Sequence, residues 1–214
     1  MENEHIAALR KEYLRDSIDP SDFPADPVAA FADWFDLVLA EQCPEPNAMV
    51  LSTVGANGRP SSRVVLLKDC TAQGLVFFTN YKSRKGEELF ANPYACLNFF
   101  WHDLERQIRV EGKVEPLPSS VNDAYFNSRP RLSQAGALAS MQSSIIPDRE
   151  GLDAEMQRLM SLPESEALVR PSHWGGYCLV PDYFEFWQGR AGRVHDRICY
   201  ELSGSEWRKF RRSP

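Results

Sequence analysis

The sequence predicts an α+β protein whose core is an antiparallel sheet or barrel with helices inserted around it. Several short runs rich in β-branched and aromatic residues follow one another directly and are separated by turn signals. The helical patterns are grouped near the start of the chain and between residues 119 and 161, so they do not alternate with these strands. A doubly wound parallel sheet would need that alternation and is therefore not expected.

The chain begins with a charged segment that is followed by an amphipathic helix. Residues 2–16 show a helical pattern and are predicted to form a mobile arm or lid, with a frayed terminal helix as the alternative. We place this helical arm at residues 1–18 and the main domain at residues 19–214. Asp26 is expected to cap the next helix, which begins at Pro27 and should bury Phe31, Trp34, Phe35, Val38 and Leu39.

The strands are predicted from residues that alternate with a period of two. Asn57-Gly58 lies between β-rich runs at 48–54 and 61–68 and is a strong hairpin signal. The stretch 106–114 places Ile108 and Val110 on a face that should be buried. Further strands are expected at 75–79, 94–101, 176–180, 183–188, 193–202 and 206–211, and helices near 119–128, 133–141 and 150–161, inside an insertion at 118–170.

Composition excludes several classes of protein. With 214 residues, of which 43% are hydrophobic, the chain can bury the core of one domain. A net charge of −6 disfavours a nucleic-acid binder. The five cysteines lack metal-ligand spacing, the four histidines are dispersed, and there is no signal peptide or membrane-length apolar run. A cytoplasmic protein without a metal site is therefore expected.

A helix start with two cations in its first turn is the clearest candidate binding feature. Ser83 can cap a helix whose first residues are Arg84 and Lys85, where the helix dipole disfavours positive charge. A bound anion would remove this conflict, because free backbone N–H groups and two cations suit a phosphate. A solvated basic turn is the alternative.

Basic residues also gather at the strand predicted near the C-terminus. Arg193, His195 and Arg197 are spaced two apart, so a regular strand would project all three from one face. They could face an anionic or π-rich ligand, or form an exposed face balanced by acids such as Glu185. Trp187 could be sheet core or could flank a planar ligand.

Two further groups of polar residues suit anions. Arg63 and Lys68 bracket an apolar run and should point to opposite faces of a regular strand, so they could serve two different anions. Tyr125, Arg129 and Ser133 offer a guanidinium and two hydroxyls near a helix end, which suits phosphate unless they are simply a surface helix terminus.

Several motifs occur in a specific order along the chain. They are Arg63-Val-Val-Leu-Leu-Lys68, Phe77-Phe-Thr-Asn80, Ser83-Arg-Lys85, Leu104-Glu-Arg-Gln107, Ser128-Arg-Pro130, Gln142-Ser143, Phe186-Trp-Gln-Gly189 and His195-Asp-Arg197. In this order they resemble the pyridoxamine/pyridoxine 5′-phosphate oxidase family over nearly the whole chain. Two departures, Val194 in place of a common Leu and the terminus Arg211-Arg212-Ser213-Pro214, remove no polar site residue.

The resemblance implies an antiparallel Greek-key split β-barrel that binds FMN as a homodimer, with flavin at the subunit interface. It implies oxidation of pyridoxine or pyridoxamine 5′-phosphate to pyridoxal 5′-phosphate, with dioxygen reduced to hydrogen peroxide. The implied cofactor residues are Arg63, Val64, Leu66, Lys68, Phe78, Thr79, Arg84, Lys85, Gln107, Gln142, Ser143, Trp187 and Arg197. The implied substrate residues are Arg10, Tyr13, Lys68, Tyr125, Arg129, Ser133, Arg193 and His195, of which Arg193 and His195 would be catalytic.

Two other functions remain open from the sequence. A split-barrel flavin oxidase could act on another aromatic substrate, as in phenazine-forming relatives, but these lack the substrate-phosphate residues. A non-catalytic protein that binds FMN or pyridoxal phosphate could use the same anion sites.

Overall fold

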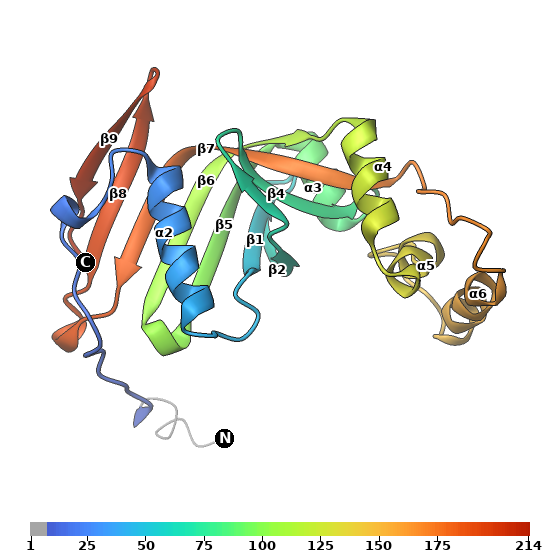
Figure 1. Cartoon of the computed structure of the whole chain (residues 1–214), viewed down its shortest axis with the longest axis horizontal. Helices are drawn as coiled ribbons and strands as arrows, with labels where there is room; N and C mark the ends of the chain where they lie inside the picture. The colour runs from blue at the N-terminus through green and yellow to red at the C-terminus, as the bar shows by residue number, and fades with distance from the viewer. Residues whose placement is uncertain (1–7) are drawn as a thin grey trace. The chain divides into compact units, whose positions relative to one another are not determined.

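The computed structural model describes residues 8–214 (Figure 1). The chain is an α+β protein that divides into two compact units. The first unit contains the residues up to Val50 together with Cys96–Glu111 and Pro181–Pro214, and the second contains Leu51–Ala95 and Gly112–Val180.

The strands of the described residues belong to one nine-stranded sheet. Its order is β2-β1-β5-β6-β7-β4-β3, and β8 and β9 continue from β7. The strands are β1 Ala48–Val54, β2 Pro60–Leu66, β3 Asp69–Thr71, β4 Gly74–Asn80, β5 Tyr94–Trp101, β6 Arg106–Pro116, β7 Trp174–Gln188, β8 Asp196–Ser203 and β9 Glu206–Arg211. The helices are α2 Pro27–Ala40, α3 Arg84–Ala91, α4 Ser119–Ser128, α5 Arg131–Ala139 and α6 Glu150–Ser161, with short 3-10 turns η1 Pro20–Asp22, η2 His102–Leu104 and η3 Ala191–Arg193.

Helix α2 forms the core of the first unit together with strands of the sheet (Figure 1). As predicted, Asp26 caps it by accepting the Val28 N–H at 2.9 Å. The buried Trp34 packs edge-on against Phe186 of β7, with ring centroids 5.2 Å apart. The prediction that Leu39 is buried is wrong, because it is 50% exposed at the last turn of the helix.

The arm preceding α2 is extended over its described part. Residues 9–16 form no helix, so the prediction of a helix over 2–16 is wrong there, while residues 1–7 lie outside the described residues. The physical reason is that the backbone N–H groups of Leu14 and Arg15 donate to the Glu105 carboxylate at 3.0 and 3.1 Å instead of to helical carbonyls. Tyr13 of this arm packs edge-on against Trp187, with centroids 5.7 Å apart.

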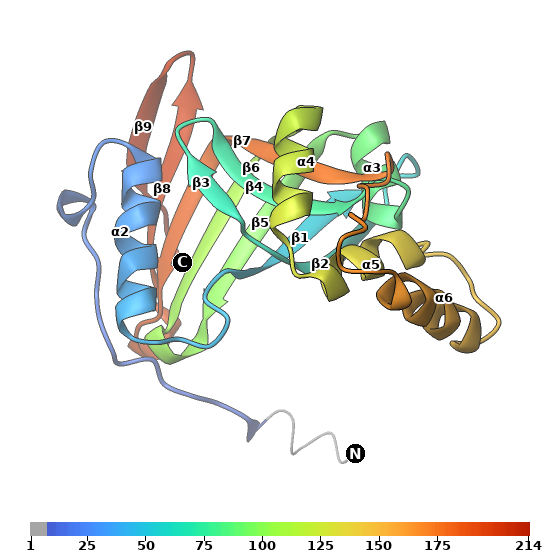
Figure 2. The same cartoon turned by 45° about the vertical axis from the view of Figure 1, so that its right-hand side comes forward.

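The second unit holds the inserted helices beside a set of antiparallel strands. The Asn57-Gly58 hairpin is confirmed, with Gly58 at a φ of 75°. Strand β4 pairs antiparallel with β7, and α4 lies beside β4 in both views (Figures 1 and 2). The helices predicted near 119–128, 133–141 and 150–161 are confirmed as α4, α5 and α6. The hydrophobic cluster in this region contains the buried residues Phe126, Ala135, Leu159, Leu168 and Trp174.

The strand ends differ from the sequence prediction in ways that affect the site. The runs at 176–180 and 183–188 form the single strand β7, and β2 ends at Leu66. The strand predicted over 193–202 begins only at Asp196, because Gly192 and Arg193 adopt left-handed φ values of 63° and 62° in η3. The prediction that Arg193, His195 and Arg197 share one strand face is therefore wrong.

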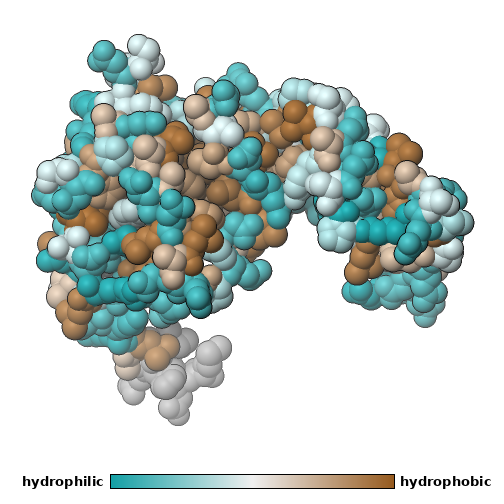
Figure 3. Space-filling model, in the orientation of Figure 1, coloured by the Kyte–Doolittle hydropathy of each residue, from teal (hydrophilic) through white to brown (hydrophobic). Residues whose placement is uncertain are grey.

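Apolar residues reach the surface in several patches among hydrophilic ones (Figure 3). Within residues 8–214, no helix has the length and apolarity needed to cross a membrane.

Candidate functional site

The second unit contains a cavity of about 290 Å³ in which cations and aromatic rings meet. Most of its lining residues were predicted as cofactor or substrate contacts. Sequence reasoning missed two of them, Val65 and Trp174. For Trp174 the only signal was an aromatic residue close before a predicted strand, which is more often core. The lining residues are Val64, Val65, Leu66, Lys68, Phe78, Thr79, Lys85, Tyr125, Arg129, Gln142 and Trp174.

Lys85 is a buried amine at the start of α3 and lines this cavity. It is 8% exposed, and its Nζ donates to Gln142 Oε1 at 2.8 Å and to Thr79 Oγ1 at 3.1 Å. Burial and the nearby Arg63 lower the pKa of Lys85 to about 8. The fold therefore holds a cation here at a cost, which an anionic ligand would offset.

Arg129 presents an unsatisfied buried donor in the same cavity. Its guanidinium lies 4.5 Å from the centre of the Trp174 ring, and its Nη1 is buried with no hydrogen-bond partner among the described residues. Burial lowers the pKa of Arg129. Tyr125, on the same helix end, stacks on Phe78 with centroids 3.8 Å apart. An orphaned guanidinium N–H beside a cavity fits an oxyanion such as phosphate.

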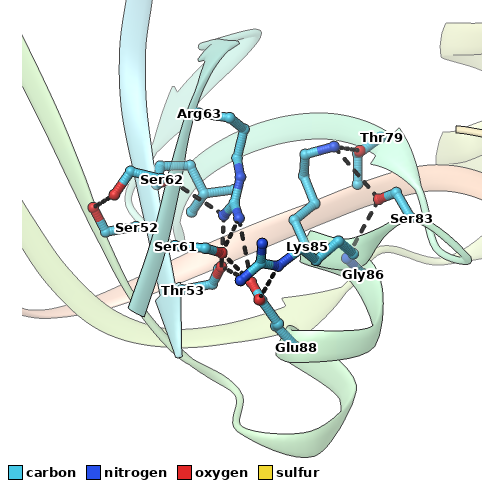
Figure 4. Close-up of polar contacts among 12 residues, drawn as sticks. Ser52, Thr53, Ser61, Ser62, Arg63, Thr79, Ser83, Lys85, Gly86 and Glu88 are labelled. Carbon is cyan, nitrogen blue, oxygen red and sulfur yellow. Dashed lines mark hydrogen bonds and ion pairs between the residues drawn. The ribbon is translucent and has the colours of Figure 1, made fainter. Parts of the chain in front are cut away.

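A cluster of charged and hydroxyl side chains lies beside Lys85 (Figure 4). Glu88 on the second turn of α3 accepts from Arg84 Nε at 2.8 Å and from Arg63 Nη2 at 3.2 Å. Its Oε2 also accepts the hydroxyls of Thr53 at 2.5 Å and Ser61 at 2.6 Å. Although burial opposes it, these hydrogen bonds lower the pKa of Glu88 to about 2. We call Thr53, Ser61, Arg63, Arg84 and Glu88 the Glu88 cluster.

The helix start predicted at Ser83 is confirmed, and its local packing is tight. The Ser83 hydroxyl accepts the Gly86 N–H at 3.4 Å. A Cβ atom at Gly86 would lie 2.2 Å from the Tyr81 carbonyl oxygen, so only glycine fits there. The conflict between two cations and the helix dipole is partly relieved by the pairing of Arg84 with Glu88.

The first unit holds a second group of predicted residues around Trp187. The His195 ring lies 4.6 Å from Trp187, and Tyr13 lies 5.8 Å from His195. His195 Nδ1 accepts the Arg190 N–H at 3.1 Å, so a neutral ring carries its proton on Nε2. Burial lowers the pKa of His195, and the charge of Arg193 adds to this effect. Trp187 is half-buried here and not part of the closed core.

Arg197 is the second residue of β8 and is held by a buried acid. Its Nη2 lies 2.5 Å from Oε2 of Glu185, which is 3% exposed. The buried Glu185 therefore balances the charge of Arg197, whose side chain is 22% exposed, and the assignment of Arg197 as a flavin contact stays a prediction. Arg193, by contrast, is exposed on η3.

Some predicted residues lie outside the cavity. Arg63 and Arg84 belong to the Glu88 cluster, and Ser133 is half-buried at the start of α5. Ser143 is exposed on a turn with a φ of 72° and lines a separate cavity of about 340 Å³. Lys68 follows β2 instead of lying on it, so the argument from opposite strand faces does not apply. The predicted cofactor and substrate residues that belong to the first unit are Arg10, Tyr13, Gln107, Trp187, Arg193, His195 and Arg197.

Comparisons with known proteins agree over most of the chain. Residues 37–161 match the family model described as pyridoxamine 5′-phosphate oxidase. Residues 174–214 match the model of the pyridoxine 5′-phosphate oxidase C-terminal dimerisation region. The pyridoxine/pyridoxamine 5′-phosphate oxidase of Herminiimonas arsenicoxydans is 50% identical over 210 residues, covering 98% of this chain and 99% of the relative. The protein of the same name from Acaryochloris marina is 48% identical over 209 residues, covering 98% and 95%.

Solved structures confirm the predicted fold class. The crystal structure of PhzG from Burkholderia lata, in complex with tetrahydrophenazine-1-carboxylic acid, has a TM-score of 0.88 and 33% identity, covering 93% of this chain and 98% of that one. A pyridoxamine 5′-phosphate oxidase-related, FMN-binding protein from Nostoc punctiforme has a TM-score of 0.68 at 17% identity and shares the fold. Because the family models, the relatives and the fold all agree, this chain belongs to the pyridoxamine 5′-phosphate oxidase family.

Proposed function

We propose that this protein is an FMN-dependent oxidase that converts pyridoxine 5′-phosphate and pyridoxamine 5′-phosphate to pyridoxal 5′-phosphate, with dioxygen reduced to hydrogen peroxide. The observation that carries the proposal is the cavity of the second unit, where Lys68, Lys85 and Arg129 line one space with three aromatic rings. Such a space suits phosphorylated aromatic molecules, because cations hold the phosphate and π-faces hold the ring.

The residues around Lys85 fit the phosphate of FMN. Lys85, Arg63 and Arg84 would supply positive charge, and the N-terminus of α3 would supply backbone N–H groups. The remaining predicted flavin contacts are Val64, Leu66, Lys68, Phe78, Thr79, Gln107, Gln142, Ser143, Trp187 and Arg197. When bound, FMN supplies the hydride acceptor and the site of reoxidation by dioxygen.

Arg129 fits the phosphate of the substrate. Its buried, unsatisfied Nη1 needs an acceptor, and Tyr125 and Ser133 lie on the same helix end and the next helix start. Lys68 lines the same cavity and adds a second cation. Binding of the phosphate would fix the distance between the substrate ring and the flavin. A fixed distance raises the reaction rate, because the two reactants no longer have to find each other in solution.

His195 and Arg193 would act on the substrate ring. The neutral His195 has a proton on Nε2 to donate to a polar group of the substrate, because Nδ1 is occupied by the Arg190 N–H. Arg193 on η3 would supply positive charge beside it. Tyr13 packs on His195 and Trp187, so the arm that carries Arg10 and Tyr13 would close over the substrate.

The oxidase would work as a homodimer with flavin at the subunit interface. The match to a dimerisation region over residues 174–214 supports a dimer. Strand β2 also supports a dimer. It is the edge strand of the sheet, and its residues Val64 and Leu66 are 67% and 38% exposed. Exposed apolar residues on an edge strand are usually covered by a partner. Sedimentation of the purified protein at micromolar concentration should give twice the mass of the chain.

A second candidate is an oxidase of another aromatic substrate, favoured by the likeness to PhzG. The molecule bound to PhzG is named as a carboxylic acid and not as a phosphate ester. A carboxylate could accept from the Arg129 Nη1 that is unsatisfied among the described residues just as a phosphate could. The phosphorylated substrates are preferred because the relatives named pyridoxine/pyridoxamine 5′-phosphate oxidase are 48% and 50% identical to this chain, whereas PhzG is 33% identical.

Oxygen consumption tests the proposed function and its rivals together. The protein loaded with FMN is mixed with pyridoxine 5′-phosphate, pyridoxamine 5′-phosphate or unphosphorylated pyridoxine, and dissolved oxygen and hydrogen peroxide are followed. We expect both phosphate esters to be oxidised and pyridoxine to react at least about tenfold more slowly, because charged hydrogen bonds to the phosphate are lost. No oxygen consumption with either ester would leave a binding protein or another substrate as the function.

A further inference from the structure

We propose that Glu88 is a positioning residue that holds Arg63 and Arg84 in place for the phosphate of the bound cofactor. This inference rests on the proposed function, in which that phosphate is part of FMN. The Glu88 side chain is 9% exposed and lies beside Arg63, as Figure 4 shows. It touches both guanidinium groups, at 3.2 Å for Arg63 and 2.8 Å for Arg84. It joins two cations that come from different elements, β2 and α3.

The two carboxylate oxygens of Glu88 have separate roles. Oε1 accepts a hydrogen bond from Arg84 Nε. The two terminal nitrogens of Arg84, Nη1 and Nη2, donate no hydrogen bond to any of residues 8–214. They remain available to an anion, while the side chain as a whole is 63% exposed and would otherwise be free to move. Oε2 accepts hydrogen bonds from Arg63, Ser61 and Thr53, and this restricts the position of the Arg63 guanidinium.

Arg63 is held more completely than Arg84. Its Nη1 donates to Thr53 Oγ1 at 2.5 Å and to the Leu51 carbonyl at 3.3 Å, and its Nη2 donates to Ser61 and Glu88. Arg63 would therefore contribute mainly charge, and Arg84 would contribute free donors. Glu88 is the one acceptor shared by both arginines in the described part of the chain.

The charges of the Glu88 cluster and of the neighbouring Lys85 together match a phosphate monoester. Arg63, Arg84 and Lys85 carry three positive charges and Glu88 carries one negative charge, which leaves a net charge of two. A phosphate monoester is mainly a dianion at neutral pH, because its second pKa is about 6. Without the carboxylate, three neighbouring cations would repel one another and separate in the free protein.

The test compares the binding of FMN with that of riboflavin, which lacks the phosphate. Apoprotein is titrated with each flavin and the quenching of flavin fluorescence gives the dissociation constants. In Glu88→Gln we expect the constant for FMN to rise about tenfold or more, since charge-assisted bonds to both arginines are lost. The constant for riboflavin should stay within about twofold, because no phosphate contact is involved.

Glu87→Gln is the matched control. Glu87 is the exposed neighbour on the same helix, so the substitution removes the same charge without touching the cluster, and FMN affinity should stay within about twofold. If Glu88→Gln does not fold, as judged by circular dichroism, Glu88→Asp replaces it. This variant keeps the charge but shortens the side chain. We expect it to lose less affinity for FMN than Glu88→Gln does, and to leave the affinity for riboflavin unchanged.

Each outcome bears on the inference. An equal loss for FMN and riboflavin would show that Glu88 only supports the fold, and unchanged or tighter FMN binding would show that it does not position the arginines. Either result overturns the proposal. A wild-type protein that binds FMN no better than riboflavin would instead refute the proposed FMN-phosphate site itself, so the two failures are distinguishable.

Discussion

Replacement of Lys85 by methionine should stabilise the apoprotein while it destroys the cofactor site. Lys85 is 8% exposed, and none of its hydrogen-bond partners within residues 8–214 is a carboxylate. Burying an unpaired ammonium costs free energy, which is why its pKa is lowered to about 8. Methionine has a similar length and fills the same space without the charge.

The size of the effect follows from that pKa. A lysine whose pKa falls from 10.5 to about 8 would destabilise the fold by at most about 3.5 kcal/mol at pH 7, since a tenfold change in proton affinity corresponds to about 1.4 kcal/mol. Solvent in the adjoining cavity screens the charge, and the hydrogen bonds of the amine offset part of the cost. We therefore expect Lys85→Met to raise the free energy of unfolding by about 1–2 kcal/mol.

Urea unfolding of the apoprotein, followed by circular dichroism from pH 7 to pH 10, measures this effect. Because the pKa of Lys85 is lower in the folded state, the unfolded state binds more protons between pH 8 and pH 10.5. The stability contributed by this group therefore rises with pH in that window. The difference in the free energy of unfolding between Lys85→Met and wild type should be largest at pH 7 and should become smaller toward pH 10.

Lys82→Met is the control, because Lys82 is exposed and its replacement removes the same charge. It should change the free energy of unfolding by less than about 0.5 kcal/mol. If Lys85→Met were less stable than wild type at pH 7, or if the difference did not vary with pH, the claim that Lys85 is held as a costly cation would be refuted. In the presence of FMN the order should reverse, with only wild type gaining stability from the ligand.

Three further predictions concern the proposed reaction and the fold. Arg129→Met should raise the KM for pyridoxine 5′-phosphate by about 10- to 100-fold, with FMN affinity within about twofold of wild type, and an unchanged KM would argue against Arg129 as the phosphate ligand. Arg193→Ala should keep FMN bound but lose most turnover, measured as kcat in the oxygen assay; normal kcat would remove Arg193 from the catalytic set. Gly86→Ala should lower the free energy of unfolding by about 1–3 kcal/mol, because the added Cβ would lie 2.2 Å from the Tyr81 carbonyl oxygen, and wild-type stability in urea would contradict this.

Most elements of the fold were predictable because their signals are local. The alternation over 106–114 is confirmed by burial at every second residue, and Asp26 caps α2 as expected. The failures occur where a distant contact outweighs a local pattern. Residues 9–16 are extended because their amides bond to Glu105, and the strand expected at 193 begins later because a left-handed turn intervenes.

The candidate site was predictable as a set of residue types, since a helix start with two cations and an arginine near a helix end both suit anions. The functional assignment of each residue stays a prediction. The role of Glu88 was not predictable, because a glutamate in a charged helix carries no local signal of burial. Its proximity to Arg63, 25 residues away in sequence, arises only when the β1–β2 hairpin and α3 fold together.

Local sequence patterns were enough to predict most strands and helices, the clusters of cations and the likeness to a family, because each signal lies in residues close together in the chain. Which cations are paired, and which lack an acceptor among residues 8–214, depends on the folded structure. Arg84 and Arg63 share Glu88, whereas Arg129 lies on Trp174 with a buried nitrogen unsatisfied. That difference depends on strand pairing and helix packing, which bring together side chains whose spacing in the sequence carries no information about their distance.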